Sequence, residues 1–405
     1  MSDLEHPIRP LNGVHVARVS TVPFFILAQL STQIKSLAAG GAKVLVVSSA
    51  GPEVREQTIV PNERWKVIDI PRSFEPLRDL CALVHLFLFF RRERTQIAHS
   101  TTPKAGLITA IAALLAGVPI RLHTFTGQPW VNLSGFKRTV VRGCDRLIGQ
   151  LNTMCYADSP SQRDFLIAEE LLTPARLRVL GVGSLAGVDV DRFSMERFPH
   201  DRCVSLRAGL GIPINSPIIL FVGRITAEKG VREMLAAYGR LKSAGSKAHL
   251  VVVGEFDDEG GLPGIIRREE LAAYRDLHVV GYTSSPESYM AIADVLCLPS
   301  YREGFGTVVI EAAAMGLSTV GTKIYGLTDA VVDGVTGLLV APFDVEALEA
   351  ALQRLLIDDI LRKAMGHSAR ARACELFDSR TVNALLVDEY SSLLQQFSIS
   401  PGSSS

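Results

Sequence analysis

The sequence predicts an α/β protein built from two doubly wound domains, each with a parallel sheet between layers of helices. The first reason is length, because 405 residues are more than a single hydrophobic core usually serves. The second is the alternation of short apolar runs with helical patterns, which is typical of parallel sheets. The third is repetition, because the alternation begins again at Pro217 after a glycine-rich stretch.

The N-terminal half begins with a strand, a helix and a strand. Residues 14–20 form the first strand, the helix ends before Gly40 and Gly41, and residues 42–49 form the second strand. A parallel connection of this kind is right-handed. The later elements of this half are a helix at 104–116 and strands at 96–100, 120–124, 147–150, 155–157 and 176–180.

A glycine-rich turn at 181–193 separates the halves, and we interpret it as a hinge. Its glycines imitate a dinucleotide fingerprint, but no long amphipathic helix follows them, so a dehydrogenase is not expected. Asp189 and Asp191 imitate a metal-binding pair within the same linker. We therefore predict no metal site there.

The second half repeats the pattern and ends in helices. Its strands are expected at 218–223, 249–254, 278–281, 293–298, 318–322 and 336–340, and its helices at 232–244, 345–356, 359–377 and 381–397. The predicted boundaries are an N-terminal domain at 1–192, a C-terminal domain at 193–380, a final helix at 381–397 and a disordered tail at 398–405.

Charge is balanced over the whole chain but not within it. Residues 1–200 hold 23 Lys and Arg against 17 Asp and Glu, although the chain has 42 of each kind. The N-terminal half is therefore the one expected to meet an anionic partner or membrane surface. Six scattered cysteines indicate free thiols, and the N-terminus lacks a signal pattern, so we expect a cytoplasmic protein.

One apolar segment, residues 80–90, is too short to span a membrane but long enough to lie on one. It is followed by Arg91, Arg92 and Arg94, an arrangement typical of helices at a membrane interface. A buried helix with a charged end explains the segment at least as well. A basic helix near 136–146 has the same two explanations, a solvated face or a face toward lipid.

The stretch SYREGFGTVVIEAAAM at 300–315 carries the strongest chemical signal. It predicts a strand end, a glycine loop and the start of a helix, with Thr307 as the N-cap. Gly304 and Gly306 let a ligand approach the backbone, and unpaired amides at a helix start bind phosphate. Glu303 and Glu311 flank this loop, so we expect them to face hydroxyls on either side of a phosphate. A nucleotide sugar has that layout.

Two cations follow the first strand of the second half. Arg224 and Lys229 lie in the loop GRITAEKG, which a doubly wound domain places on the same sheet edge as the glycine loop. Together they form a candidate diphosphate clamp that neutralises charge on a leaving nucleoside diphosphate.

These motifs resemble the family-4 retaining glycosyltransferases. The resemblance rests on GRITAEKGV at 223–231, VVVG at 251–254 and ADVLCLPSYREGFGTVVIEAAAMG at 293–316. It implies a GT-B fold, with two Rossmann-like domains facing a central cleft and a C-terminal helix that crosses back to the N-terminal domain. It also implies that no metal or other cofactor is needed.

The resemblance implies a role for each motif residue of the second half. Glu303 would contact the donor sugar, Glu311 the ribose, and Arg224 and Lys229 the diphosphate. The other donor-binding residues implied are Gly223, Gly254, Gly304, Phe305, Gly306 and Thr307, with the amides of 304–307 at the distal phosphate.

HSTTPKAG at 99–106 and RLHTFTGQPW at 121–130 resemble the branch of the family that elongates polyprenyl-diphosphate-linked sugars. This implies His123 as an active-site histidine lining the acceptor and donor sugars. Weaker candidates for the acceptor diphosphate are Thr102, Lys104, Thr126 and Arg142. The first loop, STVPFF, departs from the double glycine that many members carry, which leaves its approach to the donor phosphates open.

The expected reaction is retaining transfer of a hexose or N-acetylhexosamine from a nucleotide sugar, with UDP as the expected carrier, to a polyprenyl-diphosphate-linked glycan. Alternatives are a UDP-sugar 2-epimerase of similar build and a transferase with a soluble acceptor. A glycoside hydrolase fits poorly, because its two acids must flank the scissile bond and need no phosphate site. A non-catalytic sensor of nucleotide sugars does not account for the paired cations and acids.

Overall fold

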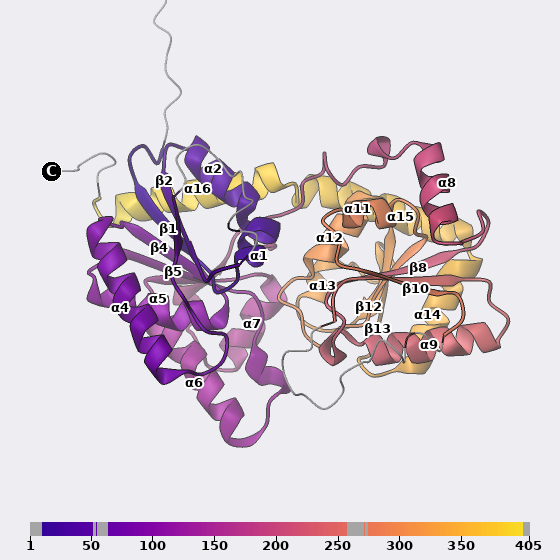
Figure 1. Cartoon of the computed structure of the whole chain (residues 1–405), viewed down its shortest axis with the longest axis horizontal. Coiled ribbons are helices and arrows are strands. Elements are labelled where there is room, and N and C mark those ends of the chain that lie inside the picture. Colours follow the sequence, from indigo (N-terminus) through magenta and orange to yellow (C-terminus); the bar gives the residue numbers. More distant parts are fainter. Residues whose placement is uncertain (1–9, 52–53, 55–63, 257–270, 272–273, 400–405) are drawn as a thin grey trace, which may run out of the picture. The chain divides into compact units, whose positions relative to one another are not determined.

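The computed structural model describes residues 10–51, 54, 64–256, 271 and 274–399. The chain divides into two compact units, one formed by Met1–Ala186 with Ser379–Ser405 and the other by Gly187–Asp378 (Figure 1). The change-over at Ala186 lies slightly before the expected boundary at 192, and the second at Asp378 lies slightly before 380. Most of the tail predicted at 398–405 lies outside the described residues.

The first unit is built on a parallel sheet with the order β3-β2-β1-β4-β5-β6-β7. Its strands are β1 (His15–Val19), β2 (Lys43–Ser48), β3 (Arg64–Val67), β4 (Ile97–Thr101), β5 (Ile120–Phe125), β6 (Met154–Ala157) and β7 (Leu177–Val179). The predicted strand at 147–150 is wrong, because these residues end a long helix. The edge strand β3 was missed because its sequence, RWKV, is short and half basic.

Helices cover both faces of this sheet. They are α1 (Pro23–Phe25), a π-helix η1 (Ile26–Leu30), α2 (Ser31–Ala39), α4 (Pro76–Arg92), α5 (Pro103–Leu115), η2 (Pro129–Asn132), α6 (Gly135–Leu151), α7 (Pro160–Ala168), η3 (Pro174–Arg176) and α16 (Ser379–Gln396). Alternate residues of a strand point to opposite faces. Val16 accordingly packs with α2 and α16, whereas Ala17 packs with α4 and α5.

The final helix α16 is therefore part of the first unit, as predicted. Its Tyr390 hydroxyl accepts a hydrogen bond from buried Arg18 of β1 (3.2 Å) and lies 2.6 Å from His99 Nδ1 of β4. Buried polar groups need such partners. This network fixes the helix on the sheet.

The second unit is built on a parallel sheet with the order β10-β9-β8-β11-β12-β13. Its strands are β8 (Ile218–Val222), β9 (His249–Val253), β10 (Leu277–Gly281), β11 (Val295–Leu298), β12 (Ser318–Thr322) and β13 (Gly337–Val340). Its helices are η4 (Met195–Arg197), α8 (His200–Gly209), η5 (Ala227–Lys229), α9 (Val231–Ser243), α11 (Pro286–Met290), α12 (Thr307–Ala314), α13 (Leu327–Ala330), α14 (Val345–Ile357) and α15 (Asp359–Leu376).

The apolar strands of the second unit are covered on both faces, since α9 packs with α14 and α12 with α15. The two α/β units confirm the predicted fold class. Within the described residues, no helix has the length and apolar character needed to cross a bilayer.

Candidate active site

At the carboxyl ends of β8 and β9 in the second unit, glycines leave the backbone without side chains. Gly223 and Gly254 follow these strands, and a Cβ added to Gly254 would lie 1.8 Å from the carbonyl oxygen of Gly223. Gly223 N donates to Val253 O (2.9 Å), which ties the two turns together. Only glycine fits at position 254, because its φ is 146° and no side chain has room.

The loop after β8 is held against the loop after β11. Gly230 has φ 68°, and a Cβ there would lie 1.9 Å from Pro299 O. Tyr301 N also donates to Glu228 O (2.8 Å). The cation loop and the glycine loop, which are far apart in sequence, are therefore adjacent, as expected of one sheet edge.

The two predicted cations each contact a carboxylate at this edge. Lys229 Nζ lies 2.5 Å from Glu303 Oε1, with both side chains largely buried. Arg224 is exposed and lies 3.3 Å from Glu228 Oε1, while Arg302 lies 2.8 Å from the other oxygen of the same group. Burial opposes ionisation of Glu228, but these cations hold its carboxyl pKa below the usual value. The edge is thus rich in preorganised charge.

The glycine loop ends in an unusual helix start. Gly306, with φ 86°, is the N-cap of α12, so the prediction of Thr307 as the cap is wrong by one residue. A Cβ at Gly326 would lie 2.8 Å from Gly304 O, which shows how closely the loop is supported from behind. Phe305 is buried and its ring meets that of Phe377 edge on, so its side chain anchors the loop in the core of the second unit.

Glu311 lies in the second turn of α12 and is partly buried. Burial raises the pKa of its carboxyl to about 7, although the positive charge of Arg192 acts in the opposite direction. No hydrogen-bond partner for this carboxylate occurs among the described residues. A partly buried acid with a raised pKa and unused acceptor capacity is typical of a functional site.

Arg192 holds the neighbouring loop in place. Its guanidinium donates to Glu287 Oε2 (2.8 Å) and Ser284 O (2.6 Å), at the start of α11. Sequence reasoning missed this residue, since nothing in the local pattern DVDRF links it to α11. Glu228 and Arg302 were also missed, although both lie within the motifs that were recognised.

In the first unit, the structure places His123 inside the domain and not at its surface. Its Nδ1 lies 2.9 Å from Ser100 Oγ, and a Cβ at Gly106 of α5 would lie 2.5 Å from its ring. Burial lowers the pKa of His123 to about 3, so the ring is neutral. His123 thus packs between β4 and α5, and its predicted contact with the sugars stays a prediction.

The four acceptor candidates divide into two pairs. Thr102 and Thr126 follow β4 and β5 at the sheet edge, and Thr102 accepts a hydrogen bond from Thr21 N (3.2 Å) at φ 69°, a strained backbone for a threonine. Lys104 instead lies 2.6 Å from Asp79, and Arg142 contacts Glu169. The hydroxyls thus remain at the edge, while the cations are paired with acids.

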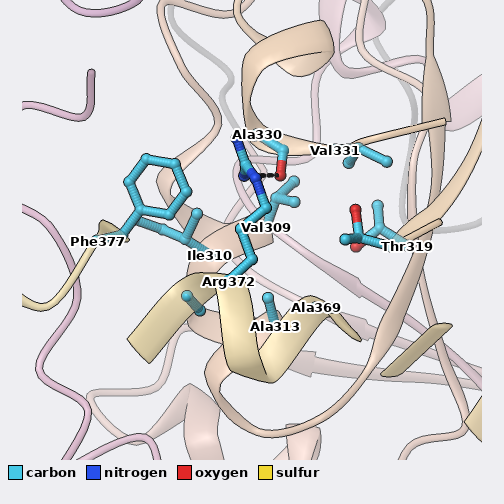
Figure 2. Close-up of a pocket in the computed structure, with 11 residues that line it drawn as sticks. Val309, Ile310, Ala313, Thr319, Ala330, Val331, Ala369, Arg372 and Phe377 are labelled. Atoms are coloured by element: carbon cyan, nitrogen blue, oxygen red, sulfur yellow. Dashed lines mark hydrogen bonds between the residues drawn. The ribbon is translucent and has the colours of Figure 1, made fainter. Parts of the chain in front are cut away.

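A small cavity behind α12 is not a ligand site. Arg372 reaches across it and donates to the carbonyl oxygens of Asp329 (2.7 Å) and Ala330 (3.1 Å), among apolar side chains such as Val309 and Phe377 (Figure 2). The free volume is about 10 Å³, room for a single water.

Comparison with known proteins agrees with this geometry. The family described as "Glycosyl transferases group 1" matches residues 205–372, and "Glycosyl transferase 4-like domain" matches residues 28–183. The capsular polysaccharide biosynthesis glycosyltransferase CapM of Staphylococcus aureus is 30% identical over 367 residues, which cover 90% of this chain and 93% of the relative.

Solved structures share the fold. Sucrose-phosphate synthase from Thermosynechococcus elongatus superposes with a TM-score of 0.79 at 21% identity, covering 95% of this chain and 100% of that one. Alr3699/HepE of Anabaena, solved with UDP and glucose, gives 0.76 at 19% identity, with 93% and 99% covered. From its two matched domains and its relatives, the chain belongs to the GT-B glycosyltransferases of the family-4 type.

Proposed function

We propose that this enzyme transfers a hexose or N-acetylhexosamine from a UDP-sugar to a polyprenyl-diphosphate-linked glycan, with retention of the anomeric configuration. The observation that carries the donor half is the edge of the second unit, where glycine backbone, the cations Arg224 and Lys229 and the acid Glu303 meet at the start of the helix that holds Glu311. The nucleotide sugar supplies a matching group for each: phosphates, sugar hydroxyls and ribose hydroxyls.

The chemistry follows from the charges at this edge. Lys229 and Arg224 stabilise the negative charge that develops on the departing diphosphate, which lowers the barrier because they are already in place. Before the donor binds, Lys229 is paired with Glu303. Exchange of that partner for phosphate leaves Glu303 free to accept a hydrogen bond from a sugar hydroxyl.

Retention requires either a covalent intermediate or a reaction on one face of the sugar. We propose the second, in which the leaving phosphate accepts the proton of the attacking hydroxyl as the new bond forms. Glu303 pairs with Lys229 before the donor binds, and we assign it the binding of a sugar hydroxyl afterwards, not attack on the anomeric carbon. No metal is expected, because the two cations perform the work that a metal ion does elsewhere.

Two observations support the proposed acceptor. Thr102 and Thr126 offer hydroxyls at the strand ends of the first unit, and the relative CapM is named for capsular polysaccharide biosynthesis. A lipid carrier would bring the enzyme to the cytoplasmic side of a membrane.

The test is transfer of label from radioactive UDP-sugars, with and without a polyprenyl-diphosphate-sugar and in the presence of EDTA. We expect label in lipid only when the acceptor is added, unchanged by the chelator, with NMR showing the donor's anomeric configuration in the product. Conversion of the UDP-sugar without acceptor would indicate the epimerase instead, and loss of activity with EDTA would contradict metal independence.

A further inference from the structure

The acidic segment that leads into the second unit is firmly packed there. From Gly187 on, the chain belongs to this unit, and Val188 N donates a hydrogen bond to Phe377 O (2.7 Å). The side chain of Phe193 is buried in the core of the same unit. Arg192 lies between these two anchors, so its backbone has a defined position.

Asp189 fixes the turn that precedes Arg192. Its Oδ1 accepts hydrogen bonds from Asp191 N (3.2 Å) and Arg192 N (3.0 Å), and its carbonyl oxygen accepts one from Phe193 N (2.9 Å). This is the pattern of an Asx turn, in which a side-chain oxygen takes the place of a backbone acceptor. The acid that imitates a metal ligand in the sequence therefore holds the turn together.

The guanidinium of Arg192 is held by three neighbours. Its Nη2 donates to Glu287 Oε2 (2.8 Å) and to Ser284 O (2.6 Å), and the group lies 5.0 Å from the centre of the Phe193 ring. The Glu287 side chain is only 11% exposed, so its carboxylate depends on this partner. A planar guanidinium fixed by hydrogen bonds and by an aromatic ring carries its charge at a defined place.

This charge acts on Glu311. Ser284 lies just before α11 and Glu287 in its first turn, and α11 packs against α12, the helix that carries Glu311 (Figure 1). Burial raises the pKa of the Glu311 carboxyl to about 7, Arg192 acts against this rise, and Glu287 adds to it.

The other helices packed against α12 carry charges of their own. Helix α15 contributes Arg372 and α13 contributes Asp329, and these two residues interact with each other. Arg192 is therefore the cation that balances the acids Glu287 and Glu311. A charged acceptor forms hydrogen bonds roughly twice as strong as a neutral one, so this balance favours the form of Glu311 that binds hydroxyls best.

We propose that Arg192 is a positioning residue for the donor, which holds the loop before α11 and places its positive charge beside the Glu311 carboxylate that receives the ribose hydroxyls. Arg192 acts through Glu311 and not through a contact with the donor. The role rests on the proposed donor site. It adds a residue that lies between the two matched family domains, at 28–183 and 205–372, and in neither of them.

The experiment measures the affinity of the full chain for UDP-glucose by calorimetry between about pH 6 and pH 9. UDP-glucose is the probe because its diphosphate does not titrate in this range. The pKa of Glu311 is about 7, so the affinity of the wild type should rise with pH through this value. In Arg192→Gln the midpoint should lie about one pH unit higher, and the affinity near pH 7 should fall about fivefold.

Two further variants separate the charge from the fold. Arg192→Lys keeps the charge without the planar fork, so its midpoint should stay near that of the wild type. Arg192→Gln with Glu287→Gln removes the acid that the single change leaves buried and unpaired, so the melting temperature should recover. The midpoint of this double variant should still exceed that of the wild type, because Arg192 acts on Glu311 more strongly than Glu287 does.

The matched control is Arg240→Gln, which removes an arginine paired with Glu349 elsewhere in the second unit and should leave the midpoint unchanged. Equal midpoints in the wild type and Arg192→Gln would overturn the role of Arg192, because an ion pair that serves only the fold alters stability alone. That result would leave the donor site intact. A wild type that binds neither UDP-glucose nor UDP would overturn the proposed donor and this role together, so the two failures are distinguishable.

Discussion

Replacing Glu311 by Gln should stabilise the protein at neutral and alkaline pH while weakening its binding of donor. The carboxyl pKa is raised from 4.5 to about 7 by burial. Between pH 4.5 and about 7, the Glu311 carboxyl is therefore protonated in the folded state and ionised in the unfolded state. Stability falls as pH rises from about 4.5 to 7, and stays lower above that.

The size of this effect follows from the shift. A displacement from 4.5 to about 7 corresponds to about 3 kcal/mol, at roughly 1.4 kcal/mol per pKa unit. Because part of the residue reaches solvent, we expect about 1–2 kcal/mol. For a unit of this size each kcal/mol moves the melting temperature by about 2–4 °C.

The assay compares melting temperatures of wild type and Glu311→Gln from pH 4.5 to 8.5. The difference should be near zero at the acid end and grow in favour of the variant as pH rises through 7. A control, Glu375→Gln on the exposed face of α15, should show no such trend. A difference that does not change with pH would refute the argument, because it would mean that Glu311 is not penalised for its charge.

Three further predictions test the site and the fold. Lys229→Ala should lower kcat/KM by about 10²–10³-fold, since it removes one of the two cations that stabilise the leaving group. It should also destabilise the fold, because Glu303 is left buried and unpaired, and a second change, Glu303→Gln, should restore stability by removing that charge. A double mutant no more stable than Lys229→Ala would contradict this. Gly230→Ala should lower the free energy of unfolding by more than about 2 kcal/mol and abolish UDP binding. The control Gly245→Ala, at a similar φ but with nothing within 4 Å of the added Cβ, should cost only about 1 kcal/mol in the same denaturant titration. Equal losses would show that the contact of Gly230 with the neighbouring loop is unimportant. Tyr390→Phe should destabilise by about 1–3 kcal/mol in the same titration, because a buried arginine and histidine lose a partner, and no change would mean that the network is dispensable.

Most of the strands followed directly from sequence because they are nearly continuous apolar runs between helical patterns. The failures have specific causes. Residues 147–150 are as apolar as a strand, but they complete the buried side of α6, and a short run carries no periodicity that separates the two. The cap of α12 was misplaced because glycine at φ 86° can begin a helix without a capping side chain.

The donor-site motifs were recognisable because each is contiguous. Lys229 and Glu303 are far apart in the chain, yet both follow strands, and the rule that strand ends share an edge was enough to bring them together. For His123 the rule places the backbone but not the direction of the side chain. It also lies near a strand end, but its side chain points beneath the edge, against Gly106.

The sequence by itself determined the two α/β units, the glycine loops and the residue types at the donor edge, because these depend on local backbone geometry and on the order of strands along the chain. The tertiary structure decided which of the candidate side chains in each unit are available to a ligand. It paired Lys104 and Arg142 with acids, buried His123, and left Glu311 without a partner among the described residues. Burial and pairing depend on contacts between distant segments, which no local pattern encodes.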